Sequence, residues 1–334
     1  MTALAVRAVA DYLPDHRTPI TDLPELAALP AAAEATFLNL GIDTVHDDPA
    51  LSPADLAAGA ARRALAEAEL SPQDVHALIV VESRAPDRLL SSEATRVQQM
   101  IGAHDALTFT VGGVGCVSIT PALLTARGLL AAQDDIENVL VVHGSKPATP
   151  RRYRHPVTVS GDGGQAVLLG RTGPVRILDI LQQTNGEYWD LFSVDYRDRA
   201  VADWSEECSD IQRYSFRLAV ETRNRLRTLH DRLLTRNGMT VADVGLHLSQ
   251  NLSTGSFRFV EESLDITLGK ACQANLRQYG HLGPNDVLLN LRTSIAAGDL
   301  AEGRRAVLLN TSPVAAWSLL LVEHGEGGGQ EYYL

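Results

Sequence analysis

Short runs of apolar and β-branched residues alternate along the chain with longer segments in which apolar residues recur at helical spacing. The short runs are typical of buried strands, and the longer segments are typical of helices packed on a sheet. Ser52 followed by Pro53 marks the start of one helix, because serine caps helices and proline fits their first turn. Predicted strands lie at 3–12, 75–82, 108–111, 139–144, 166–169, 175–182, 243–248, 305–310 and 317–322, and predicted helices at 22–34, 57–70, 91–101, 119–133, 211–236, 257–268 and 287–297. This alternation predicts an α/β protein with helices on both faces of its sheets.

The second half of the chain repeats the first in outline, as strand, helix, strand, polar loop, helix and strand. With 334 residues, the chain is long enough for two core-forming halves of ordinary domain size. We therefore predict an N-terminal half at 1–170 and a C-terminal half at 171–334. A proline- and arginine-rich stretch at 146–157 is predicted to be a loop.

The segment around Cys116 is the first candidate for chemistry. A β-prone run is followed by Gly112, Gly113 and Gly115, then by Cys116 and the apolar helix predicted at 119–133. Glycines allow a sharp turn and let backbone N–H groups approach a ligand. A thiol at the N-terminus of a buried helix faces the positive end of the helix dipole, which favours the nucleophilic thiolate. The alternative is an inert core cysteine, since free cysteines are often buried.

Composition narrows the possible partners. The net charge of −12 argues against general nucleic-acid binding and against docking on anionic membranes. Three scattered cysteines without a Cys-x-x-Cys pair indicate a reducing cytoplasm, no disulfide framework and no metal site. The N-terminus carries no signal-peptide pattern, and we expect no apolar run long enough to span a bilayer.

Several motifs together resemble a known family. Tyr12-Leu13-Pro14 follows the first strand, Gly41-Ile42-Asp43 lies before the first long helix, and Gly115-Cys116 opens the buried helix. Gly161-Asp162-Gly163 precedes an apolar strand, and Tyr279-Gly280-His281 lies in the second half. Their order and spacing resemble the ketosynthase III branch of the thiolase superfamily over nearly the whole chain. The resemblance implies a five-layered αβαβα fold built from two similar halves, a homodimer, and an active site between the halves.

The resemblance also implies a type of reaction. In this family a cysteine accepts an acyl group from the phosphopantetheine thioester of coenzyme A or of an acyl carrier protein, with no permanently bound cofactor. Decarboxylative condensation with a malonyl carrier protein follows, and a histidine and an asparagine of the second half assist it. Cys116 stands at the position of the acyl-carrying cysteine.

The first departure from the family pattern concerns its histidine motif. His247 is present, but it stands earlier than the family's histidine, whose position falls on Ser249 or Gln250. His247 is kept as a candidate catalytic residue, with a hydrogen-bonded core histidine as the alternative. Ser249 and Asn251, in the same stretch, are predicted to bind substrate.

The second departure is a histidine, His281, in place of the family's asparagine. Histidine can accept a proton near neutral pH, which asparagine cannot. Asp286, five positions later, could orient the His281 ring as the third member of a triad does. The alternatives are a solvated turn residue for His281 and a helix-capping acid for Asp286.

The third departure is the stretch 310–317, in which proline and alanines replace the glycines of the family's loop. Decarboxylation needs paired donors to stabilise an enolate, and that pair is absent in its usual form. We therefore predict an acyltransferase that moves an acyl group through Cys116 to a hydroxyl or amine of a small-molecule acceptor, with His281 as the base. The chain resembles ketosynthase III-like acyltransferases of bacterial natural-product (polyketide-type) pathways, and this resemblance implies the same setting. The alternatives are a condensing β-ketoacyl synthase and a catalytically silent partner subunit.

Arginines are clustered in two places that could serve an acidic carrier protein. Arg152 and Arg154 lie in the predicted loop at 146–157, and a guanidinium suits the phosphate of phosphopantetheine. We predict that these two residues bind substrate. The arginines of the helix at 211–236 are interpreted as a solvated face paired with acids such as Glu221 and Asp231.

Overall fold

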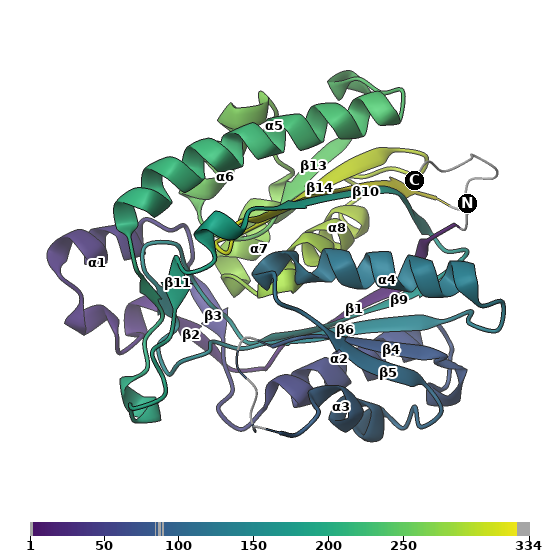
Figure 1. Cartoon of the computed structure of the whole chain (residues 1–334), viewed down its shortest axis with the longest axis horizontal. Helices are drawn as coiled ribbons and strands as arrows, with labels where there is room; N and C mark the ends of the chain where they lie inside the picture. The colour runs from purple at the N-terminus through teal and green to yellow at the C-terminus, as the bar shows by residue number, and fades with distance from the viewer. Residues whose placement is uncertain (1–2, 84, 86–87, 89, 326–334) are drawn as a thin grey trace.

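Helices and sheets alternate in five layers through the molecule (Figure 1). The structure is a computed structural model and describes residues 3–83, 85, 88 and 90–325. Within these residues the main sheet has nine strands in the order β13-β14-β15-β10-β1-β9-β6-β4-β5. Its strands are β1 (Ala5–Tyr12), β4 (Ala77–Val81), β5 (Leu107–Val111), β6 (Val139–Ser145), β9 (Gly163–Gly170), β10 (Val175–Thr184), β13 (Leu246–Ser249), β14 (Arg305–Ser312) and β15 (Ala316–His324).

Two halves of this sheet lie in different layers. Only two residue pairs join β1 to β10, so the sheet can bend there. On one side lie strands that come from residues before 171, and on the other side lie β10, β13, β14 and β15. The division into halves at 1–170 and 171–334 stays a prediction, and this strand order supports it.

Helices fill the three remaining layers, as predicted for the αβαβα fold (Figure 1). One outer layer has α2 (Pro53–Glu67) and α3 (Glu93–Ile101), and the other has α5 (Ala219–Arg236) and α6 (Thr254–Leu264). Between the sheet layers lie α4 (Ile119–Ala132) and α8 (Asp286–Ala296), with α7 (Lys270–Tyr279) beside them.

The central helix corrects one expectation from the sequence. The stretch Gly115–Ala132 is, by length and composition, apolar enough to cross a membrane. Half of it is buried inside the protein, and it lies between the two sheet layers, which explains its apolar character. We therefore assign it as a core helix.

Local sequence explains why α2 packs so closely on the sheet. The Ser52 side chain accepts from the Asp55 backbone N–H in a capping box that starts the helix at Pro53. A Cβ atom at Gly144 or Gly164 would lie 1.8 or 1.9 Å from a backbone carbonyl oxygen of the α2 region. Glycine at these two strand positions therefore lets α2 touch β6 and β9.

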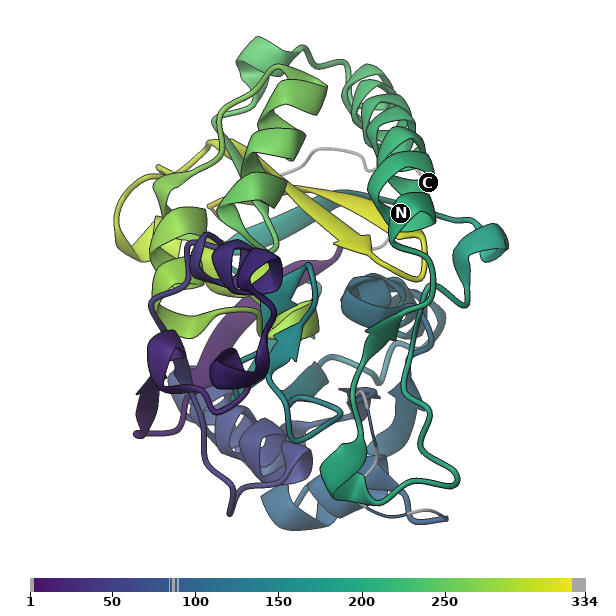
Figure 2. The ribbon, with the colours of Figure 1, turned by 90° about the vertical axis from the view of Figure 1, so that its left-hand side faces the viewer.

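The N-terminal segment differs from prediction. A helix was expected at 22–34, but prolines at 24 and 30 interrupt it. The chain instead forms short 3₁₀ turns and then α1 (Ala31–Leu38), between β2 (Arg17–Pro19) and β3 (Thr44–His46). This segment packs on the second half (Figure 2), where the Asp43 N–H donates to the Arg277 carbonyl at 2.8 Å.

Several further elements of the described chain were not anticipated, among them β11 (Phe192–Ser193) and β12 (Glu207–Cys208), which pair with each other. The helix α7 had no predicted counterpart, and the long helix expected at 211–236 begins as a π-helix, Arg213–Leu218, before α5. The loop at 146–157 is confirmed for most of its length but contains β7 (Tyr153–Arg154), which pairs with β8 (Thr158–Val159). The remaining predicted helices and strands are found within a few residues of their expected bounds.

Candidate active site

Cys116 lies in the turn that joins β5 to α4. Gly113 and Gly115 have φ angles of +87° and +57°, which glycine adopts without strain. A Cβ atom at Gly115 would also lie 2.4 Å from Ser312 Oγ, so the turn needs glycine there. A 3₁₀ turn, Gly115–Ser118, leads directly into α4 and buries Cys116 to 3% exposure.

His281 reaches Cys116 from the second half of the chain. It follows α7 through Gly280, whose φ is +63°. The His281 N–H donates to the Val159 carbonyl at 2.9 Å, and the His281 carbonyl accepts from the Gly161 N–H at 3.1 Å. These contacts place His281 Nε2 3.1 Å from Cys116 Sγ, a hydrogen-bonding distance for sulfur.

Asp286, the first residue of α8, lies behind the His281 ring. The His281 Nδ1–H donates to Asp286 Oδ2 at 2.6 Å, which leaves Nε2 facing Cys116. The carboxylate also accepts from the Leu282 N–H at 2.8 Å and from the Asn251 N–H at 2.9 Å. His281 and Asp286 are both fully buried. The structure therefore brings Cys116, His281 and Asp286 into one hydrogen-bonded chain, as their predicted roles require.

The charges in this chain shift the titration of His281. Burial alone would lower the pKa of His281, but the negative charges of Cys116 and Asp286 outweigh burial and raise it from 6.5 to about 10. At neutral pH this shift favours the imidazolium form of His281, 3.1 Å from Cys116 Sγ. A cation beside a cysteine sulfur favours the thiolate, which is the nucleophilic form of the residue.

Comparisons with known proteins show what the chain as a whole is similar to. No family model matches the chain. The chain is 28% identical over 327 residues to a β-ketoacyl-[acyl-carrier-protein] synthase III of Cereibacter sphaeroides, covering 95% of this chain and 98% of that protein. The similarity thus extends over both halves and spans almost the whole length of each protein. The chain is therefore similar to ketosynthase III enzymes over nearly its whole length.

Solved structures show the same fold for this ketosynthase III-like chain. ChlB3, described as an acyltransferase, superposes with a TM-score of 0.82 at 20% identity, covering 96% of this chain and 98% of ChlB3. The 3-oxoacyl-(acyl carrier protein) synthase III of Pseudomonas aeruginosa gives 0.78 at 21% identity, covering 98% and 100%. Both structures confirm the thiolase-like architecture predicted from the sequence.

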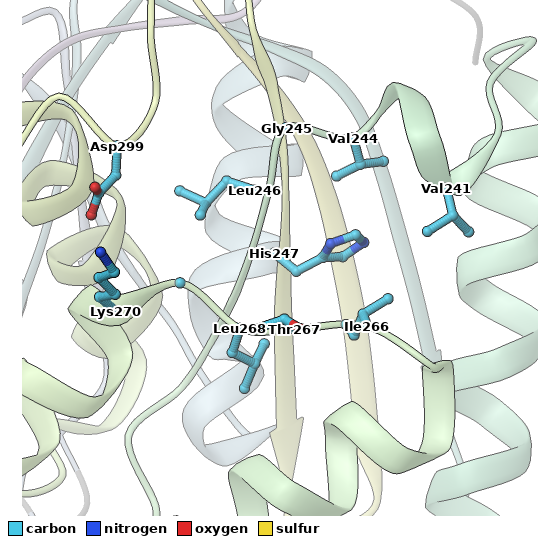
Figure 3. A pocket seen from close by; sticks show the side chains of 11 residues that line it. Val241, Val244, Gly245, Leu246, His247, Ile266, Thr267, Leu268, Lys270 and Asp299 are labelled. Atoms are coloured by element: carbon cyan, nitrogen blue, oxygen red, sulfur yellow. The ribbon is translucent and has the colours of Figure 1, made fainter.

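His247 lies outside the hydrogen-bonded chain of this ketosynthase III-like protein. It is in β13, 6% exposed, and its Nε2 lies 3.1 Å from His230 Nε2 on α5. Figure 3 shows its ring among Val241, Val244 and Ile266, at a pocket of about 430 Å³ whose described lining does not include Cys116. The structure thus corrects the candidate catalytic role of His247 and supports the alternative, a hydrogen-bonded core histidine.

This buried histidine pair predicts a pH effect on stability. Burial, with His230 adding to it, lowers the pKa of His247 from 6.5 to about 4. The unfolded chain therefore takes up a proton at a higher pH than the fold does, and stability is lost as pH falls from 6.5 towards 4. The expected loss is about 1.4 kcal/mol per pH unit for one proton. Urea unfolding at pH 7.5, 6 and 5 should show a shallower dependence in His247→Gln, and equal slopes would contradict the assignment.

Arg152 and Arg154 do not form an open phosphate site. Arg152 lies 2.7 Å from the carboxylate of Asp162, and Arg154 lies 2.6 Å from that of Glu206. The Arg154 side chain is only 5% exposed. A phosphate would have to displace an internal carboxylate, so this geometry does not favour phosphate binding by these two residues. Their role in binding substrate stays a prediction. On α5, the expected pairing of Arg225 with Glu221 is confirmed at 2.8 Å.

Ser249 and Asn251 lie beside the site, and each makes main-chain hydrogen bonds there. Ser249 closes β13, and the hydrogen bonds found for it within the described chain use its backbone N–H and carbonyl. The Asn251 N–H contacts Asp286, as stated above. Their roles in binding substrate stay predictions.

Sequence reasoning missed a second asparagine at the site. Asn310, fully buried on β14, donates from Nδ2 to the Cys116 carbonyl at 2.7 Å and so fixes the turn that carries Cys116. A polar residue inside an otherwise apolar predicted strand was the available signal. After Asn310, the chain turns sharply at 312–316, next to Gly115. Ala315 adopts a φ of +51° in this turn, a conformation that glycine usually supplies.

Proposed function

We propose that this chain is an acyltransferase that carries an acyl group on Cys116 from a phosphopantetheine thioester to a hydroxyl or amine of a small-molecule acceptor. The observation that carries this proposal is the buried chain of hydrogen bonds from Cys116 through His281 to Asp286. This is the arrangement of nucleophile, base and orienting acid used in acyl transfer.

In the first step the Cys116 thiolate attacks the thioester carbonyl. The tetrahedral intermediate collapses with cleavage of the bond between the carbonyl carbon and the pantetheine sulfur, and the His281 imidazolium supplies the proton to that leaving sulfur. The backbone N–H of Cys116, at the start of its helical turn, would stabilise the oxyanion. The products are the free pantetheine thiol and acyl-Cys116, with His281 now neutral.

The second step uses the same histidine as a base. Acylation removes the negative charge from Cys116, and with it one of the charges that raise the pKa of His281. Neutral His281 then takes the proton of the acceptor hydroxyl or amine, which attacks the acyl carbon. Cleavage of the bond to sulfur restores the Cys116 thiolate and the imidazolium, so protons and electrons balance over the cycle.

Three observations favour transfer over condensation. Both ring nitrogens of His281 are engaged, one by Cys116 and one by Asp286. Ser249, one of the two residues on which the family's histidine position falls, uses its main chain within a buried network. ChlB3, whose fold this chain shares, is described as an acyltransferase. The Cereibacter sphaeroides relative is named a β-ketoacyl synthase, so decarboxylative condensation is the second candidate function.

The proposal includes the setting of the reaction. The donor is an acyl carrier protein or coenzyme A thioester, the pathway makes a polyketide-type natural product, and the enzyme works as a cytoplasmic homodimer. A silent partner subunit is disfavoured because a complete nucleophile, base and acid are present at hydrogen-bonding distances.

A two-stage assay separates these functions. The protein is incubated with a set of acyl thioesters and the mass of the intact chain is measured, and we expect one acyl adduct that maps to Cys116. Addition of hydroxyl or amine acceptors should then discharge the adduct, whereas malonyl carrier protein should release no carbon dioxide. Carbon dioxide release coupled to loss of the adduct would support condensation instead. No adduct with any donor would support a silent subunit.

A further inference from the structure

Buried asparagines hold the loop that follows β13. The Nδ2 of Asn290, on α8, donates to the Ser249 carbonyl at 2.7 Å and to Asn251 Oδ1 at 2.8 Å. Its Oδ1 accepts from Asn275 Nδ2, on α7, at 2.8 Å. Asn290 and Asn251 are fully buried, and Asn275 is 4% exposed. Donors and acceptor of the Asn290 amide are thus all used, which determines how the amide is oriented.

This network ends at the carboxylate behind His281. The Asn251 N–H donates to Asp286 Oδ2 at 2.9 Å, and the same oxygen accepts from His281 Nδ1 at 2.6 Å. Asp286 and Asn290 are four residues apart on α8 and therefore lie on the same helix face. The helix α8 thus carries both the Asp286 carboxylate and the Asn290 amide. The Asn290 amide in turn holds Asn251, whose backbone N–H donates to the Asp286 carboxylate.

The ring of hydrogen bonds from Asn290 through Asn251 to Asp286 closes along α8 and is buried, while Asn251 Nδ2 has no hydrogen-bond partner among the described residues. Buried amides are costly unless their hydrogen bonds are made, and a satisfied network fixes the positions of its members. Loss of the Asn290 amide would release the Asn251 main chain. Asp286 would then lose a donor that fixes the oxygen facing His281.

We propose that Asn290 is a positioning residue for the Cys116–His281 pair, because it holds Asn251 against Asp286 and so keeps the carboxylate aimed at the imidazolium. The inference rests on the proposed function for the roles of Cys116 and His281. Asn290 itself contacts neither of these side chains in the hydrogen bonds described, and it acts through Asn251 and Asp286.

Other titratable groups near this ring are few among the described residues. Cys272, on α7, lies 3.6 Å from Asn290 Nδ2, and burial, with Asp286 contributing, raises the pKa of its thiol to about 12. His143, on β6, packs against Gly283, and its Nδ1 lies 3.0 Å from the Val81 carbonyl. Cys272 is thus a neutral thiol at the pH values of the test.

The test measures the rate of alkylation of Cys116 by iodoacetamide as a function of pH, followed at the level of the Cys116 peptide. Asn290→Ala should weaken the support of the imidazolium, so that the thiolate forms at a higher pH. The expected upward shift of the alkylation midpoint is about half a pH unit to one pH unit. Circular dichroism checks that the variant is folded.

The same helix offers a matched control. Ser294 is fully buried one turn beyond Asn290, and its hydroxyl has no hydrogen-bond partner among the described residues. Ser294→Ala should therefore leave the midpoint unchanged. If Asn290→Ala does not fold, Asn251→Ala tests the same hydrogen bond between Asn290 and Asn251. This variant removes the Oδ1 acceptor but keeps the backbone N–H that donates to Asp286. The two changes together should shift the midpoint no further than either one alone.

The outcomes separate this inference from the proposed function. If His281→Ala raises the midpoint but Asn290→Ala and Asn251→Ala keep the wild-type value, the positioning role is wrong and the proposed function stands. If His281→Ala itself changes nothing, the proposed base is wrong. An equal shift in Ser294→Ala would show a general effect of core packing and would overturn the inference.

Discussion

Cys116→Ala is expected to abolish acyl transfer, with a loss on the order of 10³-fold or more in kcat/KM. The reason is that the variant has no sulfur to carry the acyl group, and the buried His281 ring cannot replace it as a nucleophile in the same place. The measurements are the mass of the intact chain after incubation with an acyl thioester, and the rate of acyl transfer to an acceptor. Both the adduct and turnover should disappear.

Cys208→Ser is the control for that experiment. Cys208 is a free cysteine that is more exposed than Cys116. Burial raises the pKa of its thiol, so it should react slowly with thioesters. This variant should keep both the adduct and wild-type turnover. An adduct that persists in Cys116→Ala and vanishes in Cys208→Ser would remove Cys116 from the mechanism.

His281→Ala should leave an enzyme that becomes acylated but turns over poorly. Cys116 can still be acylated at a pH where its thiol ionises without help, whereas discharge lacks the base that deprotonates the acceptor. We expect transfer to the acceptor to fall by about 10²- to 10⁴-fold, the usual contribution of a general base. Quenched-flow mass spectrometry should show acyl-Cys116 accumulating over many seconds.

His247→Gln provides the matched histidine control. His247 is also buried, but it pairs with His230 and lies outside the Cys116 chain. Its turnover should therefore remain within a few-fold of wild type, since core polar substitutions at a distance act mainly on stability. If His281→Ala transferred its acyl group at the wild-type rate and His247→Gln lost turnover, then His247 and not His281 would be the base.

Several parts of the fold could be predicted because their causes are local. The capping box of α2 and the periodic small residues after it lie within one short stretch of chain. The turn at Cys116 was predictable because its glycines stand next to the cysteine. By contrast, α7 escaped prediction, since its N-cap is Gly269, which offers no capping side chain, and the helix has only 10 residues.

The predicted partnership of His281 and Asp286 also depended on local spacing. Five positions separate them, and a turn followed by a helix start brings such residues together. The ion-pair partners of the loop arginines could not be predicted in this way. Arg154 is paired with Glu206, which is 52 residues away along the chain, so a count of charges in the loop says nothing about what neutralises them.

By itself, the sequence determined the α/β architecture, the glycine turn at Cys116 and the short spacing that brings His281 and Asp286 together. Hydrophobic spacing, glycines and short-range capping decide these features within a few residues. Only the tertiary structure decided that Cys116 meets His281 across 165 positions, that His247 turns away to His230, and that Asn251, Asn290 and Asn310 hold the site. These contacts join elements from distant parts of the chain, and their geometry is set by how the sheets and the helices between them pack.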